Sequence, residues 1–286
     1  MGDILRIQCK YTEASETLTE AQRQFLEIGN VLGAAQCSRS LGNILFMQSK
    51  YAEASDTLTE AQRQFIDIGD VLGAAQCSRS LGDILRMQSK YIEASETLTE
   101  AQRQFLEIGN VLGAAQCSQS LGNILFMQNK YAEASDTLTE AQRVFLDIGD
   151  VLGAAQCSRS LGDILRMQCK YTEALDTLTE AQRQFLEIEN VLGAAQCSRS
   201  LGNILFKQNK YAEASETLTE AQTKFLDIGH VLGAAQCLQS LGNILHMQSK
   251  YTEASEALTE AKRQFFEIGL VQDATECSES LDGIVC

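Results

Sequence analysis

Residues 30–70 read NVLGAAQCSRSLGNILFMQSKYAEASDTLTEAQRQFIDIGD. Two sets of apolar residues recur in this stretch at intervals of three and four, which is the spacing of one face of an α-helix. The first set is Val31, Ala34, Cys37, Leu41, Ile44 and Leu45, and the second is Tyr51, Ala54, Leu58, Ala61, Phe65 and Ile68. The stretch therefore predicts two antiparallel helices of about 16–18 residues, helix A and then helix B, separated by the polar segment 48–50.

Glycine and capping residues mark the turn that leads from helix B to the next helix A. Gly29-Asn30 and Gly69-Asp70 stand there, because glycine suits the left-handed position after a helix and Asn or Asp caps the helix that follows. Glu189 replaces this glycine in one copy. Since a positive φ is costly for glutamate, we expect that junction to be distorted.

The same unit is repeated along the whole chain. Lys-Tyr recurs seven times with a constant period of 40, at 10–11, 50–51, 90–91, 130–131, 170–171, 210–211 and 250–251. Such a period is typical of a solenoid, in which each unit packs only on its neighbours. The tyrosines are expected to wedge the turn between helix A and helix B, and the small residues Gly42, Ala54 and Ala61 to let the helices approach closely.

The linked positions Leu41-Gly42-Asn43 and Tyr51-x-Glu53-Ala54-x3-Leu58-x2-Ala61 resemble the tetratricopeptide repeat (TPR) family. The resemblance implies an all-α, right-handed superhelical solenoid of antiparallel helix pairs. The unit departs from the usual 34 residues, because Ser38 fills the tryptophan slot and Leu26 or Ile66 replaces the closing proline. The phrase Ile68-Gly69-Asp70-x-Leu72-Gly73-x-Ala75 resembles the 40-residue variant of the Pins-type polarity adaptors. Similar arrays follow the ATPase module of some signalling proteins.

The repeat register predicts one array over residues 1–286, with about seven repeats. It begins with half of a helix A at 1–9 and closes with a helix A at 271–285. Neither end carries an obvious polar capping helix. The chain is therefore interpreted as a fragment of a longer array, or as one whose ends stack on other copies.

Composition restricts the class of function. The formal charge of −15 disfavours nucleic acid and anionic membrane, and no apolar run is long enough to cross a bilayer. Seven of the ten cysteines share one repeat position and are too far apart for disulfides, which predicts reduced thiols and a cytoplasmic, reducing location. His230 and His246 occupy unlike positions and are interpreted as surface variants. No metal, cofactor or catalytic motif is found, so the chain is predicted not to be an enzyme.

By the resemblance, helix A lines a concave groove. The predicted partner-binding residues are Arg39, Asn43, Phe46, Arg79, Asp83, Arg86, Asn123, Phe126, Arg159, Arg166, Arg199, Asn203 and Phe206. Arginine suits carboxylates, so the predicted ligand is an acidic peptide or protein segment. Two alternatives stay open for the arginines: they bind the ligand, or they pair with Asp3, Asp83 and Asp163 at helical spacing. A carboxylate clamp is not predicted, because Ser80 and Ser120 stand where it would need Asn and Arg.

A second period of 80 residues runs through helix A. Asp and Asn alternate at positions 3, 43, 83, 123, 163 and 203, and Arg and Phe alternate three residues later, from Arg6 to Phe206. Paired duplication explains this pattern without any function, and a functional meaning is the alternative. Three functions remain: an interaction scaffold, an array that assembles end to end into homo-oligomers, or the sensor region of a larger signalling ATPase.

Overall fold

The computed structural model describes residues 11–285, and within them every regular element is an α-helix. The predicted half helix at 1–9, with Asp3 and Arg6, lies outside the described residues. Helices B begin at the repeated tyrosine: α2 (Tyr11–Glu27), α4 (Tyr51–Asp67), α6 (Tyr91–Glu107), α8 (Tyr131–Asp147), α10 (Tyr171–Glu187), α12 (Tyr211–Asp227) and α14 (Tyr251–Glu267). Helices A alternate with them: α3 (Val31–Met47), α5 (Val71–Met87), α7 (Val111–Met127), α9 (Val151–Met167), α11 (Val191–Lys207), α13 (Val231–Met247) and α15 (Val271–Val285).

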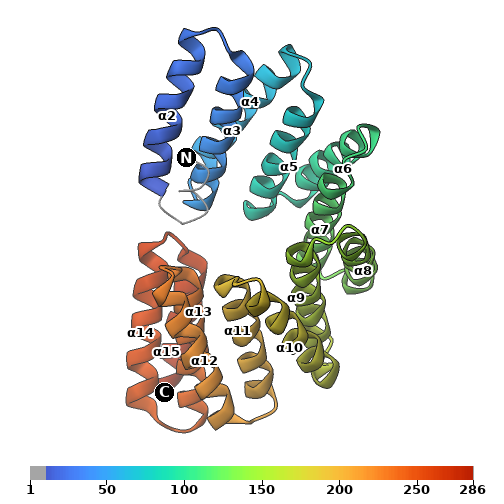
Figure 1. Cartoon of the computed structure of the whole chain (residues 1–286). Coiled ribbons are helices and arrows are strands. Elements are labelled where there is room, and N and C mark those ends of the chain that lie inside the picture. The colour runs from blue at the N-terminus through green and yellow to red at the C-terminus, as the bar shows by residue number, and fades with distance from the viewer. Residues whose placement is uncertain (1–10, 286) are drawn as a thin grey trace. The chain divides into compact units, whose positions relative to one another are not determined.

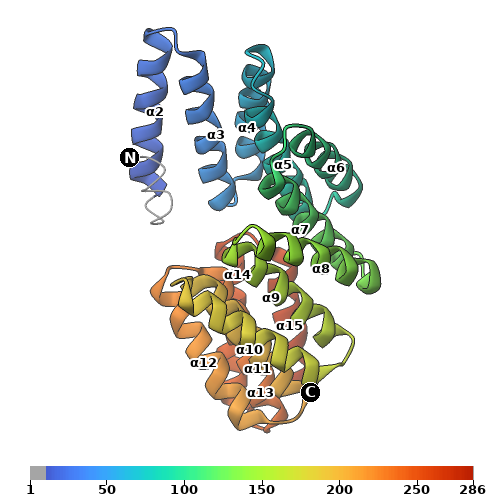
Figure 2. The same ribbon diagram turned by 45° about the vertical axis from the view of Figure 1, so that its right-hand side comes forward.

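The chain divides into two compact units, residues 1–148 and 149–286. Within each unit, every helix returns antiparallel to the one before it and packs against it (Figure 1, Figure 2). Successive helices A also contact one another directly, as α3 does α5 and α11 does α13. The predicted all-α array of antiparallel helix pairs is thereby confirmed. That residues 1–286 form one continuous array stays a prediction.

The core runs as a line through each unit, because helices B pack against the helices A beside them, as α4 does between α3 and α5. One cluster joins Ala54, Leu58 and Phe65 of α4 to Cys77 and Ile84 of α5, and all five side chains are buried. Full burial of a Leu, Ile or Phe side chain stabilises the fold by about 1.5–3 kcal/mol. The same cluster recurs repeat by repeat in both units.

Helix packing demands glycine at the predicted close approach. A Cβ atom at Gly42 would lie 2.6 Å from Cγ of Leu58, which is closer than real side-chain contacts allow. The sequence analysis did not single out a second contact of this kind, at Gly33, where a Cβ would lie 2.7 Å from the ring of Phe25. Both glycines let a large side chain of helix B pack onto the backbone of helix A.

Both turns close in the same way, although their sequences differ. In the turn after helix B, Asn30 donates its backbone N–H to the carbonyl of Phe25 (2.8 Å), and its side chain accepts from the N–H of Gly33 (2.9 Å). In the turn after helix A, Lys50 donates to the carbonyl of Leu45 (2.9 Å). The left-handed residue there is Ser49 with φ +60°, where the sequence predicted only a polar break.

Val31 and Ile68, the outermost members of the two apolar sets, lie at helix ends and are 44% and 40% exposed. One expectation from the sequence is wrong. Glu189 does not distort its junction: it takes φ +56°, and Asn190 still donates to the carbonyl of Phe185 (2.8 Å). The strained backbone conformation of Glu189 is tolerated because the surrounding hydrogen bonds hold the turn in place.

His230 is also not a surface variant. It is half-buried at the N-cap of α13, where its Nδ1 accepts from the N–H of Gly233 (3.0 Å) and its ring lies 5.3 Å from that of Phe225. It therefore caps the helix as Asn and Asp do in the other repeats. Burial lowers the pKa of His230, which keeps Nδ1 free to accept.

Candidate functional site

The predicted site residues all lie on helices A and are partly buried. In the first unit, α3 carries Arg39, Asn43 and Phe46, α5 carries Arg79, Asp83 and Arg86, and α7 carries Asn123 and Phe126. In the second unit, α9 carries Arg159 and Arg166, and α11 carries Arg199, Asn203 and Phe206. The direct contacts between successive helices A place these residues on adjoining surfaces within each unit.

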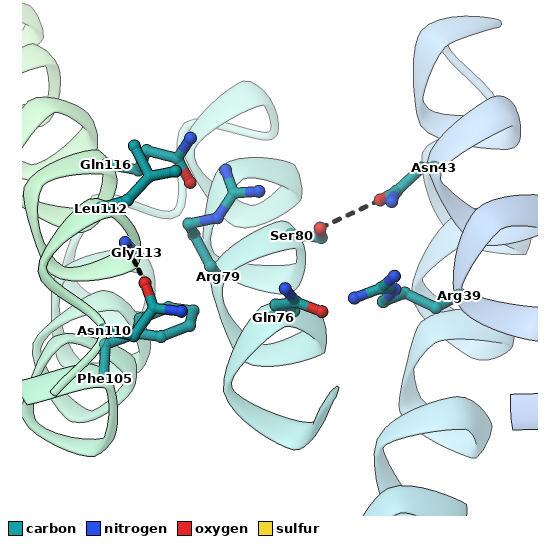
Figure 3. A pocket seen from close by; sticks show the side chains of 10 residues that line it. All are labelled: Arg39, Asn43, Gln76, Arg79, Ser80, Phe105, Asn110, Leu112, Gly113 and Gln116. Atoms are coloured by element: carbon teal, nitrogen blue, oxygen red, sulfur yellow. Dashed lines mark hydrogen bonds between the residues drawn. The ribbon is translucent and has the colours of Figure 1, made fainter. Parts of the chain in front are cut away.

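A cavity of about 240 Å³ opens on this surface in the first unit. It is bordered by Arg39 and Asn43 of α3, Arg79 of α5, and Gln116 of α7, among others. Figure 3 shows Arg39 and Arg79 reaching from neighbouring helices into the space that Gln76, Asn110 and Gln116 border. The cavity thus brings together three of the predicted residues, Arg39, Asn43 and Arg79, and the other predicted residues do not line it.

The arginines of the Asp-containing helices pair within their own helix. Asp83 lies between Arg79 (Nη1 to Oδ2, 3.6 Å) and Arg86 (Nε to Oδ1, 3.6 Å). Asp163 is placed in the same way between Arg159 and Arg166, at 3.4 Å from each. The interpretation as pairing at helical spacing therefore holds for these two helices.

Arg39 and Arg199 are different, because Asn stands where the other helices have Asp. Within residues 11–285, neither guanidinium forms an ion pair. The Nε of each is buried without a hydrogen-bond partner, but so are those of Arg79, Arg86 and Arg159. Burial lowers the pKa of Arg199, opposed by the negative charge of nearby Asp163. In the described residues, the alternation of Asp and Asn therefore separates arginines that have an ion pair within their helix from arginines that have none.

Serines join the helices A, and the sequence analysis missed their role. Ser80 of α5 donates to Oδ1 of Asn43 on α3 (3.0 Å), and its place in the cavity is shown in Figure 3. Ser120 donates to Asp83 (2.7 Å) and Ser200 to Asp163 (2.8 Å). Asn and Asp both accept this bond, so the contact between successive helices A is kept while the charge at the position varies.

A second series of hydrogen bonds joins each helix B to the helix A that follows it. Gln62 of α4 donates its amide to the hydroxyl of Ser78 on α5 (2.8 Å), and Ser78 donates to the carbonyl of Ala74. The same bond is made by Gln22, Gln102 and Gln182 to the serines 16 residues later. Ser78 and its equivalents occupy the tryptophan slot of the usual repeat, so they replace an aromatic contact with a polar one.

The phenylalanines assigned to the groove mainly support the turn after helix A. The ring of Phe46 lies 5.9 Å from that of Tyr51, and Phe126–Tyr131 and Phe206–Tyr211 repeat this contact. Pairs at this distance and tilt stabilise by about 0.5–1.5 kcal/mol beyond their burial. The tyrosines therefore wedge the turn, as the repeat pattern predicts.

No group of His, Cys, Asp and Glu within residues 11–285 is arranged to hold a metal ion. The repeated cysteines are free and buried, and burial raises the pKa of Cys77 to about 12. Cys169 is exposed, and Cys9 and Cys286 lie outside the described residues. In the described part of the chain, no helix combines the length and the apolar character that crossing a bilayer requires.

The chain matches the tetratricopeptide repeat family over residues 72–147 and 152–226, and again over 199–265. Comparison with curated protein sequences found no significant match. Among solved structures, it is similar to a Rap protein complexed with Competence and Sporulation Factor (15% identity, TM-score 0.70, covering 96% of this chain and 79% of that one). It is also similar to the apo quorum sensor NprR from B. thuringiensis (10% identity, TM-score 0.65, covering 100% and 85%).

A third similar structure is a signal transduction ATPase with a tetratricopeptide repeat sensor from Pyrococcus horikoshii. Its identity is 13% and its TM-score 0.61, and the match covers 99% of this chain and 48% of that one. At these identities the three likenesses show a shared fold.

Proposed function

This chain belongs to the tetratricopeptide repeat family, and we propose that it is a non-catalytic scaffold that binds a peptide or protein segment along its helices A. The observation that carries the proposal is the cavity of the first unit, which Arg39 borders and where no carboxylate within residues 11–285 pairs with its guanidinium. A peptide carboxylate at this cavity would supply a charged partner for that guanidinium. The groove residues named from the sequence remain the proposed site.

The ligand we propose is acidic. Arg39 and Arg79 enter the same cavity, and within residues 11–285 an ion pair with a carboxylate, that of Asp83, is found for Arg79 but not for Arg39. Carboxylates of a peptide would meet planar guanidinium groups, which bind them through two parallel hydrogen bonds. In the second unit, Arg199 offers the same unpaired group on α11.

Relatives of this fold support peptide binding as the general mode. The Rap structures were solved with Competence and Sporulation Factor and, for the regulator of plasmid pLS20, with the Phr* peptide. We further propose that the chain represents the 40-residue, Pins-type form of the repeat, since its period is 40 throughout. A role as the sensor of a larger signalling ATPase is the second candidate, favoured by the sensor of similar fold in the Pyrococcus protein.

A reciprocal pair of substitutions tests the acidic groove. Asn43→Asp places a carboxylate four residues after Arg39, as Asp83 stands relative to Arg79, and Asp83→Asn frees Arg79 and Arg86. Both residues accept the serine bond between helices, so neither change should disturb the fold. A charged hydrogen bond contributes about 1.5–3 kcal/mol, so Asn43→Asp should weaken the binding of an acidic peptide roughly 10- to 100-fold. Asp83→Asn should strengthen the binding of the same peptide.

The measurement is fluorescence anisotropy with a labelled panel of acidic peptides, and the same peptides with Gln and Asn in place of Glu and Asp serve as control. Sedimentation velocity on the same samples shows whether the chain is monomeric. Equal affinity for the acidic and neutral panels, or an affinity that neither substitution changes, would contradict the proposal of an acidic ligand. Reversible growth with concentration, unaffected by acidic peptide, would favour end-to-end assembly instead.

A further inference from the structure

A row of exposed aliphatic side chains follows the turns between helix B and helix A. In the first unit this apolar edge consists of Leu26, Val31, Ile66, Val71, Leu106 and Val111, which are 44–62% exposed. The turns that carry it lie at the same end of the unit, as those between α2 and α3 and between α4 and α5 show (Figure 1). The residues that close the opposite turns are polar, Gln-Ser-Lys at 48–50 and 88–90.

The apolar edge is hollowed where two repeats meet. A cavity of about 180 Å³ lies between the end of α4, the start of α5 and α6. It is bordered by Ile66, Val71 and Ala74, with Gln62 and Gln104 on its sides. An apolar cavity of about 150 Å³ is large enough for benzene, so this one admits an aromatic or aliphatic side chain.

The surface beside the apolar edge is acidic. In α4, Arg63 pairs with both Glu60 (2.6 Å) and Asp67 (3.2 Å), so two carboxylates share one cation. The last turns of α2 and α6 repeat this arrangement around Arg23 and Arg103. Each repeat thus leaves one uncompensated negative charge next to the apolar residues. A second copy of the chain would bring like charges together there, whereas a basic partner would neutralise them.

We propose that the apolar edge of the first unit docks an amphipathic helix of a partner protein, with aliphatic or aromatic residues on one face and Lys or Arg beside them. Packed helices lie about 8–10 Å apart, so the exposed aliphatic residues of successive repeats recur at about this distance or more. Residues one heptad apart on a helix are separated by about 10.5 Å along its axis. A helix with a heptad pattern therefore presents one anchor to each repeat. None of the residues of the apolar edge lines the cavity of Arg39 and Arg79.

The test uses a labelled helical peptide of about three heptads, with Leu at the a and d positions and Lys at the flanking positions. Anisotropy is measured with the whole chain and with the double variant Ile66→Gln/Leu106→Gln. Both residues are exposed, so the variant should keep its helix content. The control is Met87→Gln, which removes a 44% exposed apolar side chain from the opposite end of α5.

The expected result is binding that the double variant weakens roughly tenfold or more, because a few buried anchors carry most of an interface. Met87→Gln and the groove variant Asn43→Asp should leave it unchanged, and a peptide with Glu in place of Lys should not bind. Equal binding by the double variant or by a scrambled Lys/Leu peptide would overturn the proposal. So would self-association of the wild-type chain that the double variant abolishes, since the edge would then join two copies.

Discussion

Gly82 offers the sharpest test of how the helix pairs are held together. It lies in α5, and a Cβ atom there would be 2.6 Å from Cγ and 2.8 Å from Cδ2 of Leu98, which is fully buried in α6. Overpacking of this kind costs about 1–3 kcal/mol. Alanine is better than glycine in a helix by about 1 kcal/mol, which offsets part of the cost. We therefore expect Gly82→Ala to lower the free energy of unfolding by about 1 kcal/mol.

Gly283 provides a matched control for Gly82. It also lies in a helix, α15, but a Cβ there would meet nothing within 4 Å. Gly283→Ala should therefore raise stability by up to about 1 kcal/mol, from helix propensity alone. The same substitution is thus expected to lower the free energy of unfolding at a crowded position and to raise it at an open one.

Urea unfolding followed by circular dichroism and by tyrosine fluorescence measures both effects, and two probes are needed because repeat arrays need not unfold in one step. Leu98→Ala alone should cost about 2–5 kcal/mol. Combined with Gly82→Ala it should cost less than the sum, because the new methyl group enters the space that Leu98 leaves. Strict additivity, or a stabilising Gly82→Ala, would refute the packing argument.

Two further predictions concern residues that replace the repeat consensus. Glu189→Gly relieves a left-handed conformation that costs a side-chain-bearing residue about 1–2 kcal/mol, so the urea midpoint should rise. Gly109→Glu, at the equivalent turn between α6 and α7, should lower the midpoint. His230 has a lowered pKa, so the folded state binds its proton less readily than the unfolded state. The contribution of neutral His230 to stability is complete above the unfolded-state pKa of about 6.5, and it is lost as the pH falls toward the lower pKa of the folded state. His230→Asn should remove this loss of stability at low pH. The measurement is the difference in unfolding free energy between pH 7.5 and 5, and an unchanged difference in the variant would contradict the capping role.

Much of the fold follows from spacing and turn residues alone. Helix B begins at the repeated tyrosine, as the pattern around Tyr51 predicts, and Gly42 lies at a close approach of the helices, as expected. Periodicity cannot say how far a neighbouring repeat reaches, so it places Val31 and Ile68 in the apolar sets without showing that both are exposed. It also cannot show that Ser49 takes the left-handed conformation usually left to glycine, because that depends on hydrogen bonds closed across the turn.

The candidate site could be predicted less completely. The sequence indicates which helix carries Arg39 and Arg79, and it raises the question of whether Asp83 neutralises its neighbours. The structure answers that question for each helix separately, through distances that spacing does not contain. Ser80 was overlooked because a serine in a helix is unremarkable until the register between two helices brings it to Asn43.

The series of Gln–Ser bonds between helix B and helix A has a consequence for local unfolding. Leu238 replaces the serine on α13, and Lys262 replaces the glutamine on α14, so in the described residues the last two of these junctions lack the bond that the earlier ones make. Each bond contributes about 0.5–1.5 kcal/mol. Nearly identical repeats would otherwise open at nearly equal cost. The backbone amides of α13–α15 should therefore exchange with solvent sooner than those of α10 and α11, and unravelling should advance from that end toward Gly149.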